Sequence, residues 1–475
     1  MRAFHLKTGA LIAVCLAGAL FSFAQAPQGS DAESLASLRE RADHGAADAQ
    51  LALGKIYVEG KKAPQDFKEG AAWLRKAADQ GNAEAQENLA KLYYNGSGMP
   101  RDFSEAAVWL RKAADQGYAP AQAVLGVLYD SGNGVPKDLK EAAVWLRKAA
   151  DQGNELAEYG LGNAYFYGKG VSRDFGEAAR WWRKAADQGD AYSQEELGLM
   201  YQDGEGVAVD YGEAARLFRK AADQGQSSAQ VNLGKLYFQG KGVPQDYGEA
   251  LRWYRKSAEQ GNAAAQVDLG SVYERGIGGV AADPSEAAGW YRKSADQGVA
   301  EAQRRLARLY SKGDGVPKDS SEAALWNHKA ANQGNAEAQL ALGLQYTKGD
   351  GVPIDAAEAA RWYRKAADQG DPGGEFMLGV AYSGGQGVTW DLKEALRWKR
   401  MAADQGYPLA QEELAYVYST GQGVAFDNVQ AYMWILLASR GKDIGKSREQ
   451  LAAKMTPEQL AEGERLAAQW KPSGK

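Results

Sequence analysis

The chain has almost no cysteine, because only Cys15 occurs among its 475 residues. Cys15 lies in an N-terminal segment that we expect to be removed, so the mature chain has no residue for a disulfide or a thiolate metal site. Histidine is nearly as scarce, and only His44 and His328 lie beyond that segment. Neither has a partner at a metal-ligand spacing, and no Ser-His-Asp set can be assembled beyond chance. We therefore expect both histidines at the surface and predict no catalytic, metal-binding or cofactor-binding residue.

Proline and excess positive charge are also lacking. Thirteen prolines accompany 57 glycines, a ratio that excludes collagen and proline-rich linkers. The formal charge is -5, so the chain has no basic surface to neutralise phosphates, and we expect no nucleic-acid partner. Hydrophobic residues make up 45% and charged residues 25% of the chain, which is typical of a soluble globular protein.

The N-terminus predicts a cleavable secretory signal peptide over residues 1–26. Arg2 and Lys7 precede an apolar stretch over 9–23, which is shorter than the roughly 20 residues of a spanning helix. The small residues that follow fit cleavage after Ala24 or after Ala26. Removal of the two basic residues leaves 54 positive and 61 negative side chains, a balance of -7. We expect a periplasmic or secreted protein with no integral membrane span after cleavage.

The abundant glycine marks an internal repeat. The tripeptide Asp79-Gln80-Gly81 returns every 36 residues as far as Gly225, and the period continues to Gly406 with a single one-residue insertion before Gly298. Gly45 and Gly441 extend the series at its two ends, which gives eleven repeats. Periods of this length are typical of stacked repeat proteins.

Each repeat predicts two helices, and the first, helix A, has one apolar face. In the second repeat Ala85, Leu89, Leu92 and Tyr93 follow helical spacing, and Gly96 is placed as a C-terminal cap. A glycine follows the leucine in most helices A. We expect another backbone to approach closely there, because glycine otherwise lowers helix stability.

The second helix, helix B, opens with a predicted capping box such as Asp66 with Glu69. A tryptophan recurs at one position of helix B, with Leu217 as the single replacement; the tryptophans are Trp73, Trp109, Trp145, Trp181, Trp253, Trp290, Trp326, Trp362, Trp398 and Trp434. A side chain that recurs at the repeat period is expected to be an inter-helix core wedge and not a ligand-stacking site. Basic pairs such as Arg111-Lys112 near the end of helix B are interpreted as a solvated face.

The predicted fold is all-α: an α/α superhelical solenoid of about eleven 36-residue helix-turn-helix repeats with terminal capping helices. We expect an N-terminal capping helix in residues 27–45, the repeats in 46–441, and a C-terminal capping helix pair and tail in 442–475. In the tenth repeat, Pro372-Gly373-Gly374 is expected to disrupt the first turn of helix A.

The motifs A-x-A-Q, L-G-x-x-Y, G-x-G-V-P-x-D, E-A-A-x-W and K-A-A-D-Q-G resemble those of the Sel1-like repeat (SLR) family, whose members are related to tetratricopeptide repeats. The resemblance covers roughly residues 46 to 441. It implies an adaptor that holds a protein or peptide partner, without a cofactor. Some members join the helices of each repeat by a disulfide, and this chain lacks the necessary cysteines.

The leading hypothesis is an exported scaffold that binds its partner in a concave groove lined by helix A and performs no catalysis. Two alternatives remain open: an enzyme that acts on an envelope polymer or a small molecule, and a structural factor in cell-envelope assembly or stress tolerance. The resemblance also implies the site, since the inner surface of tetratricopeptide relatives is lined by helix A positions away from the wedge. These positions are Glu84, Glu87, Lys91, Tyr94, Tyr159, Asn163, Phe166, Tyr192, Glu195, Gln202, Lys235, Phe238, Arg304 and Arg308. The alternative is that these side chains pack against neighbouring helices A.

Overall fold

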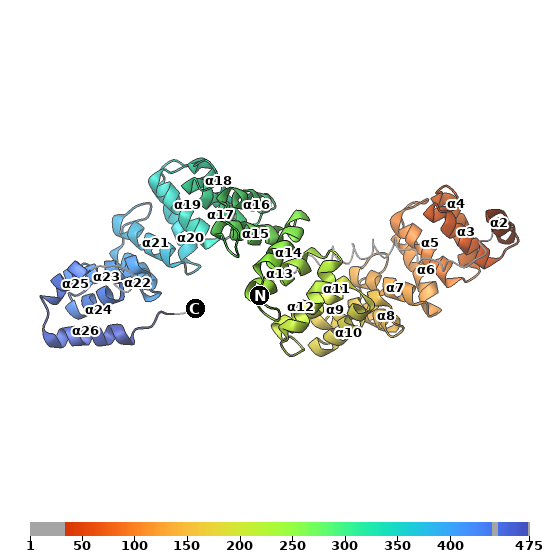
Figure 1. Cartoon of the computed structure of the whole chain (residues 1–475), viewed down its shortest axis with the longest axis horizontal. Helices are drawn as coiled ribbons and strands as arrows, with labels where there is room; N and C mark the ends of the chain where they lie inside the picture. Colours follow the sequence, from red (N-terminus) through yellow and green to blue (C-terminus); the bar gives the residue numbers. More distant parts are fainter. Residues whose placement is uncertain (1–33, 439–444, 474–475) are drawn as a thin grey trace. The chain divides into compact units, whose positions relative to one another are not determined.

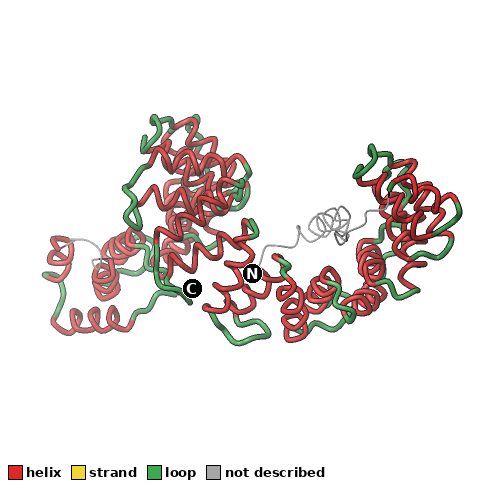
Figure 2. The backbone as a smooth tube through the Cα atoms, turned by 45° about the vertical axis from the view of Figure 1, so that its right-hand side comes forward, coloured by secondary structure: helices red, strands yellow, loops and turns green. Residues whose placement is uncertain are grey.

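The chain is built from helices. A computed structural model describes residues 34–438 and 445–473, and in these ranges it contains 25 helices and no strand (Figures 1 and 2). The all-α prediction is confirmed. The predicted signal peptide lies outside the described residues.

The chain divides into two compact bodies, Met1–Gln245 and Asp246–Lys475. In the N-terminal body, α2 (Leu35–Asp43) precedes the repeats. The helices A of this body are α3 (Ala47–Glu59), α5 (Ala83–Asn95), α7 (Ala119–Ser131), α9 (Glu155–Tyr167), α11 (Ala191–Asp203) and α13 (Ser227–Gln239). Its helices B are α4 (Phe67–Asp79), α6 (Phe103–Asp115), α8 (Leu139–Ala150), α10 (Phe175–Gln188) and α12 (Tyr211–Asp223).

The C-terminal body continues the same alternation. Its helices B are α14 (Tyr247–Glu259), α16 (Pro284–Asp296), α18 (Ser320–Asn332), α20 (Ala356–Ala367), α22 (Leu392–Asp404) and α24 (Asn428–Ala438). Its helices A are α15 (Ala263–Arg275), α17 (Ala300–Lys312), α19 (Ala336–Lys348), α21 (Pro372–Gly384) and α23 (Pro408–Thr420). Two further helices, α25 (Gly445–Ala452) and α26 (Pro457–Gln469), follow the last repeat.

The helix ends are set by the residues that the sequence marks as caps. Asp66 accepts hydrogen bonds of 2.9 Å from the backbone N–H groups of Lys68 and Glu69 at the start of α4. Gly96 ends α5 with a φ of 72°, a left-handed conformation that favours glycine. The Glu69 carboxylate accepts a 3.0 Å hydrogen bond from the Trp73 indole N–H. The same bond from the indole to the glutamate one turn before it recurs in five further repeats, but it is not formed at Trp109 or Trp362.

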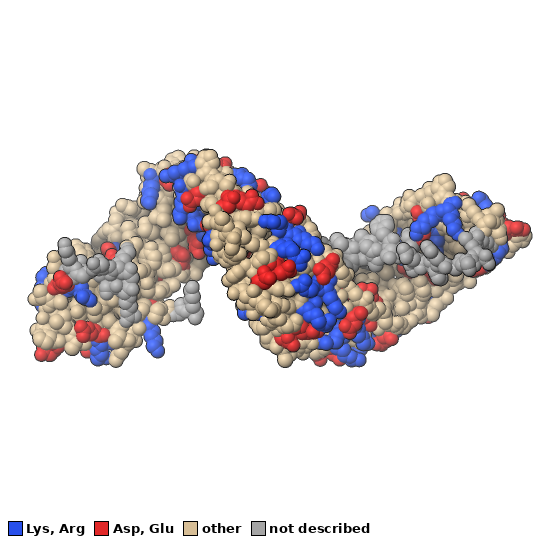
Figure 3. Space-filling model, in the orientation of Figure 1, with Lys and Arg blue, Asp and Glu red and all other residues tan. Residues whose placement is uncertain are grey.

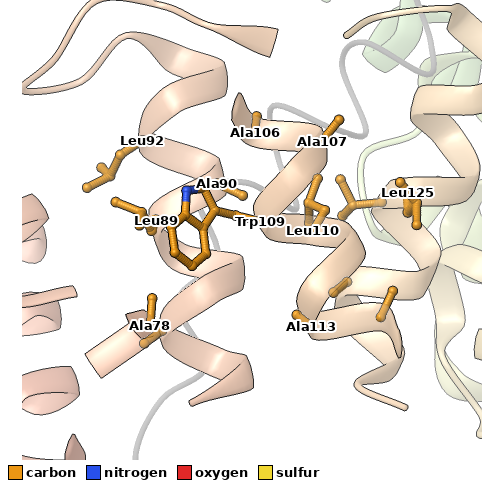
Figure 4. Packing of buried hydrophobic residues seen from close by; sticks show 14 of the residues in the cluster. Ala78, Leu89, Ala90, Leu92, Ala106, Ala107, Trp109, Leu110, Ala113 and Leu125 are labelled. Carbon is orange, nitrogen blue, oxygen red and sulfur yellow. The ribbon is translucent and has the colours of Figure 1, made fainter. Parts of the chain in front are cut away.

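The recurring tryptophan is the core wedge, as predicted. All ten side chains are at most 9% exposed. Figure 4 shows Trp109 projecting from α6 against Leu89 and Leu92 of α5, above Ala78 at the end of α4. Trp109 therefore joins helix A of its own repeat to helix B of the preceding repeat, and the burial of so large a side chain stabilises that interface.

The glycine after the helix A leucine admits the backbone of helix B, as we expected, and a side chain as well. A Cβ atom on Gly379 would lie 2.9 Å from the Ala395 carbonyl oxygen, and one on Gly54 would lie 3.2 Å from that of Gly70. A Cβ atom on Gly54 would lie 2.6 Å from Leu74 Cγ, and one on Gly162 would lie 2.3 Å from Trp182 Cδ1. Leu74 and Trp182 each follow the wedge residue directly. The residue after the wedge therefore packs on the glycine of its own repeat, and its size changes along the chain.

The glutamines of the A-x-A-Q and D-Q-G motifs form a set of buried hydrogen bonds that we call the glutamine ladder. Gln86, which is 4% exposed, donates a 3.0 Å bond from Nε2 to the carbonyl oxygen of Ala78 in the preceding repeat. Gln116 then donates a 2.8 Å bond to Gln86 Oε1. The same bonds recur along both bodies. Because buried polar groups need partners, the ladder explains why both glutamines recur.

The arginine of each basic pair of helix B holds successive repeats together, so the interpretation as a solvated face is wrong for the arginine, while the lysine is exposed. Arg111 donates a 2.6 Å hydrogen bond to the Tyr129 hydroxyl of the next repeat, and its guanidinium lies 4.9 Å from the centre of the Trp145 ring. Lys112 Nζ lies 3.7 Å from the centre of the Trp109 ring of its own helix. We call the contact of Arg111, Tyr129 and Trp145, and its equivalents, the Arg–Tyr–Trp joint. Cation–π contacts and packing of the long side chains stabilise it.

The tenth repeat keeps an intact helix A, so the expected disruption of its first turn is wrong. Pro372 occupies the first helical position, where its missing N–H costs nothing, and Asp371 accepts a 2.7 Å hydrogen bond from the Gly374 N–H. A Cβ atom on Gly374 would lie 2.6 Å from Ala366 Cβ. The glycine thus allows α21 to approach α20 closely.

Candidate protein-binding surface

Successive helices A approach one another directly within each body. The helix α7 contacts α9, and α19 contacts α21. The predicted site residues lie on these helices at positions that face away from the wedge. Their side chains change from repeat to repeat, while the glutamine ladder and the Arg–Tyr–Trp joint keep the same residue types in most repeats.

In the second repeat the predicted residues are paired. Lys91 Nζ lies 2.8 Å from Glu87 Oε1, and both side chains are largely buried. Burial raises the pKa of Glu87, and the neighbouring Lys91 ammonium partly offsets this. Glu84 lies 2.7 Å from Lys55 of the first repeat. Tyr94 accepts a 3.4 Å hydrogen bond from Asn133 Nδ2 of the third repeat.

Two aromatic residues that we predicted to bind a partner belong to the core. Tyr159 and Phe166 are each 9% exposed and lie in one hydrophobic cluster. The Phe166 ring centre lies 5.2 Å from that of Trp182, the residue that follows the wedge in the fourth repeat. The helix A face of the fourth repeat is therefore only partly exposed, because the large Trp182 side chain packs against Phe166. Asn163 on the same helix is only partly buried.

In the fifth and sixth repeats the predicted residues are more accessible. Glu195 accepts hydrogen bonds from Ser228 Oγ at 2.6 Å and from Gln226 Nε2 at 3.1 Å, both in the sixth repeat. Burial raises the pKa of Glu195, and these two bonds oppose the rise. The remaining members of the set are Tyr192, Gln202 and Phe238, which are partly buried, and Lys235, which is exposed.

Arg304 and Arg308 take part in an ionic network across three helices A of the C-terminal body. Arg304 lies 2.7 Å from Glu301 on its own helix α17 and 2.7 Å from Glu337 on α19. Arg308 pairs with Glu274 on α15. Burial acts to raise the pKa of Glu301, but the hydrogen bonds from Arg304 and its neighbour Arg305 lower it overall. Both predicted arginines are thus neutralised by carboxylates of the protein.

A pocket opens between α7, α8 and α9, beside one of the predicted residues. Its volume is about 620 Å³, including the part open to solvent, and Leu146, Tyr159 and Ala164 line its apolar wall. Asn163 and Lys169 supply polar groups at this pocket. A Cβ atom at Gly160 would lie 3.1 Å from Leu146 Cδ2, so the absence of a side chain at Gly160 leaves this space. The arrangement suits the insertion of an apolar side chain.

Some charged residues on the exposed faces form ion pairs within their own helix. Figure 3 shows Lys and Arg lying beside Asp and Glu on the visible face. Arg216, for example, lies 2.6 Å from Glu213, and Arg252 lies 2.9 Å from Glu249. Such exposed pairs contribute little to stability and make no large surface of one sign.

The described residues contain no group of three or more His, Cys, Asp or Glu side chains arranged to hold a metal ion. None of the described helices has both the length and the apolar character needed to cross a bilayer. His44 and His328 are exposed, as predicted. His328 stacks edge-on against Trp362 at 5.8 Å, in the place that an arginine takes in the other joints.

Three exposed apolar residues that share one loop position in the C-terminal body were not predicted from the sequence. Ile354, Trp390 and Phe426 are 73%, 62% and 62% exposed. Each occupies the variable position of a G-x-G-V-P-x-D loop. Alignment of the eleven loops by repeat position would have found them, because a large apolar residue before the capping aspartate occurs in three consecutive repeats.

These features define an all-α helical repeat protein whose neighbouring hairpins are joined by the same buried contacts. The chain belongs to the Sel1 repeat family. The eleven matched segments are residues 47–82, 83–118, 119–154, 156–190, 191–226, 227–262, 263–299, 300–335, 336–371, 372–407 and 408–443. Sel1 repeat proteins generally mediate protein–protein interactions and are typically not catalysts.

Two solved structures share this fold. One is a protective antigen present in uropathogenic Escherichia coli strains, which displays an SLR fold; it is 40% identical over 92% of this chain and 94% of its own, with a TM-score of 0.83. The other is a Sel1 repeat protein from Oxalobacter formigenes, 34% identical over 69% of this chain and 99% of its own, with a TM-score of 0.52. A comparison with proteins of curated function gave no match.

Proposed function

We propose that this chain is an exported scaffold that binds a protein or peptide partner on the helix A face. One observation carries the proposal: the residues of this face differ from repeat to repeat, while the ladder and the joint that hold the repeats keep the same residue types in most repeats. If the helix A residues were needed only for packing, we would expect them to recur as the ladder and joint residues do. Their variation favours specific recognition of a partner.

The pocket beside Gly160 supports the same proposal at one point of the face. It presents apolar walls and the polar side chains of Asp130, Asn163 and Lys169, which is the chemistry of a site that receives one anchoring side chain. The binding site that we propose therefore centres on Asn163 and includes the accessible predicted residues Tyr94 and Tyr192. The buried Tyr159 supports the pocket wall from within.

Export is part of the proposal. The N-terminal pattern of basic, apolar and small residues supports it. The E. coli relative is described as a protective antigen, and export of this chain agrees with that description. We propose the periplasm or the cell exterior as the place where the partner is met.

Site-specific photo-crosslinking in living cells tests the binding face. A benzophenone amino acid at Asn163 should give a discrete crosslinked adduct with a partner. The matched control places the same amino acid at Val144, which is 46% exposed on helix B of the adjacent repeat. Equal adducts at both positions, or none at Asn163, would contradict the proposed face.

A further inference from the structure

Three large apolar side chains are exposed at one repeated position in the C-terminal body. Ile354, Trp390 and Phe426 each precede the aspartate that caps helix B, in the ninth, tenth and eleventh repeats. We call the surface formed by these three residues the loop edge. Exposed apolar side chains that recur together mark interaction sites, whereas single ones are common on any surface.

The fold does not require apolar residues at this position. In the second, third and fourth repeats it is occupied by Arg101, Lys137 and Arg173. The hairpins of those repeats have the same cap and the same loop glycines. Burial cannot account for the apolar residues of the loop edge either, since each is more than 60% exposed.

Carboxylates outnumber cations around the loop edge, where the exposed cations next to the three loops are Lys348 and Lys393. In the tenth and eleventh repeats the loops read G-Q-G-V-T-W-D and G-Q-G-V-A-F-D, and their only charged residues are Asp391 and Asp427. The ninth loop contains Asp350 and Asp355 and no cation. An apolar surface bordered by carboxylates repels anionic lipid and nucleic acid and favours a partner with basic groups.

A pocket adjoins one end of the loop edge. It has a volume of about 690 Å³, including the part open to solvent, and Ile354 lines it together with Tyr363, Met377 and Val380. Gln386 from the next loop also lines it. The Tyr363 hydroxyl lies 2.8 Å from Thr347 Oγ1, so the wall of the pocket is fixed by a hydrogen bond. The pocket is wide enough to take an apolar side chain from a chain lying along the loops.

We propose that the loop edge docks a polypeptide segment whose apolar side chains are flanked by lysine or arginine. Trp390 and Phe426 supply the aromatic contacts that anchor interfaces, and the pocket beside Ile354 receives one apolar side chain. Asp355, Asp391 and Asp427 face the basic groups of the segment. This surface is separate from the helix A pocket at Asn163, and it stands independently of that proposal.

The test uses the mature chain and labelled synthetic dodecapeptides. One peptide alternates leucine with lysine, a second replaces every lysine by glutamate, and a third replaces every leucine by serine. Fluorescence anisotropy should show binding of the first peptide, with at least tenfold weaker binding of the other two. The Trp390→Ser and Phe426→Ser double variant should lose at least tenfold in affinity for the first peptide.

The matched control is Val209→Ser, at the equivalent loop position of the fifth repeat and 55% exposed. It should leave peptide affinity unchanged. Equal binding of the glutamate peptide, or an unchanged affinity in the double variant, would overturn the proposal. A fall in the melting temperature of the double variant would also overturn it, because the side chains would then be structural.

Two further measurements distinguish peptide binding at the loop edge from membrane binding and from self-association. Sedimentation with vesicles of phosphatidylglycerol should show no binding that depends on Trp390 and Phe426. Analytical ultracentrifugation should give the same mass for the parent chain and the double variant. Vesicle binding or a dimer that disappears in the double variant would assign the loop edge to a membrane or to a second copy of the chain, and would refute a peptide site.

Discussion

The Gln405 side chain donates a 2.9 Å hydrogen bond to the carboxylate of Glu375, at the ladder position where nine repeats have glutamine. In those repeats the glutamine also donates to the end of the preceding helix B, as Gln339 does to the Ala331 carbonyl at 3.0 Å. An ionised glutamate has no donor for that carbonyl, but a protonated one has. The tenth repeat therefore contains a ladder that is complete only when Glu375 holds a proton.

We predict that Glu375 makes the C-terminal body less stable as the pH rises. Burial raises the pKa of Glu375 to about 7; the bond from Gln405 lowers it and the charge of Asp371 raises it. An unfolded glutamate has a pKa of about 4.3. Between about pH 4.3 and pH 7 the folded state therefore binds a proton at Glu375 that the unfolded state does not bind. The stabilisation from this proton is complete below about pH 4 and is lost as the pH rises through about 7. The free energy of unfolding falls by on the order of 3 kcal/mol over this range.

Glu375→Gln should therefore melt at a higher temperature than the parent chain at pH 8, and the difference should vanish near pH 4.5. The reverse change in the ninth repeat, Gln339→Glu, should lower the melting temperature at pH 8 and recover at low pH. Calorimetry at several pH values measures both. Identical pH profiles for the parent and Glu375→Gln would show that the carboxylate finds another partner.

Removal of a wedge tryptophan should destabilise the N-terminal body. Trp145 is 3% exposed and donates a 2.8 Å hydrogen bond to Glu141, so Trp145→Ala is expected to cost about 3–5 kcal/mol. Val144→Ala, at the exposed neighbouring position, is the control and should cost less than about 0.5 kcal/mol. Denaturant unfolding followed by circular dichroism measures both, and equal effects would refute the wedge.

The Arg–Tyr–Trp joint should show energetic coupling between repeats. Arg111→Ala and Tyr129→Phe each remove one side of a 2.6 Å hydrogen bond. A double-mutant cycle should give a coupling energy of about 0.5–1.5 kcal/mol. The cation–π contact with Trp145 remains in Tyr129→Phe, so that variant is expected to lose less stability than Arg111→Ala. Additive effects would mean that the two side chains stabilise the joint separately.

Export predicts a shortened N-terminus. N-terminal sequencing of the protein from the periplasm or the medium should begin at Gln25 or Pro27, after cleavage at Ala24 or Ala26. An Ala24→Arg, Ala26→Arg double variant should accumulate as uncleaved precursor. A soluble pool that begins at Met1 in the parent chain would contradict export.

The periodic features of the fold could be predicted because each recurs in most of the eleven repeats. The spacing of Ala85, Leu89 and Leu92 predicts the buried face of α5, and the tryptophan series predicts the wedge. The cross-repeat contacts could not be predicted in the same way. Arg111 meets Tyr129 only because of the angle at which the next hairpin packs, and local patterns contain no information on that angle.

The candidate site was harder to predict, since exposure at one helix position depends on a different residue in each repeat. Phe166 occupies the same position as the more accessible Gln202 and Phe238. Phe166 is buried because Trp182, where other repeats have smaller side chains such as Leu74, extends beneath it. The position of a residue in the repeat gives its direction, but the size of its neighbour decides whether it reaches solvent.

The Arg–Tyr–Trp joint also bears on how such a chain can change in length. The arginine of one repeat finds its tyrosine and tryptophan in the next, and the same three residue types meet at joints as distant as Arg111 and Arg364. A duplicated or deleted block of one whole repeat would recreate the joint that it interrupts. Recombination between repeats within either body can therefore lengthen or shorten the protein without creating an unmatched interface. The helix A residues proposed to bind a partner would be gained or lost together with the repeat that contains them.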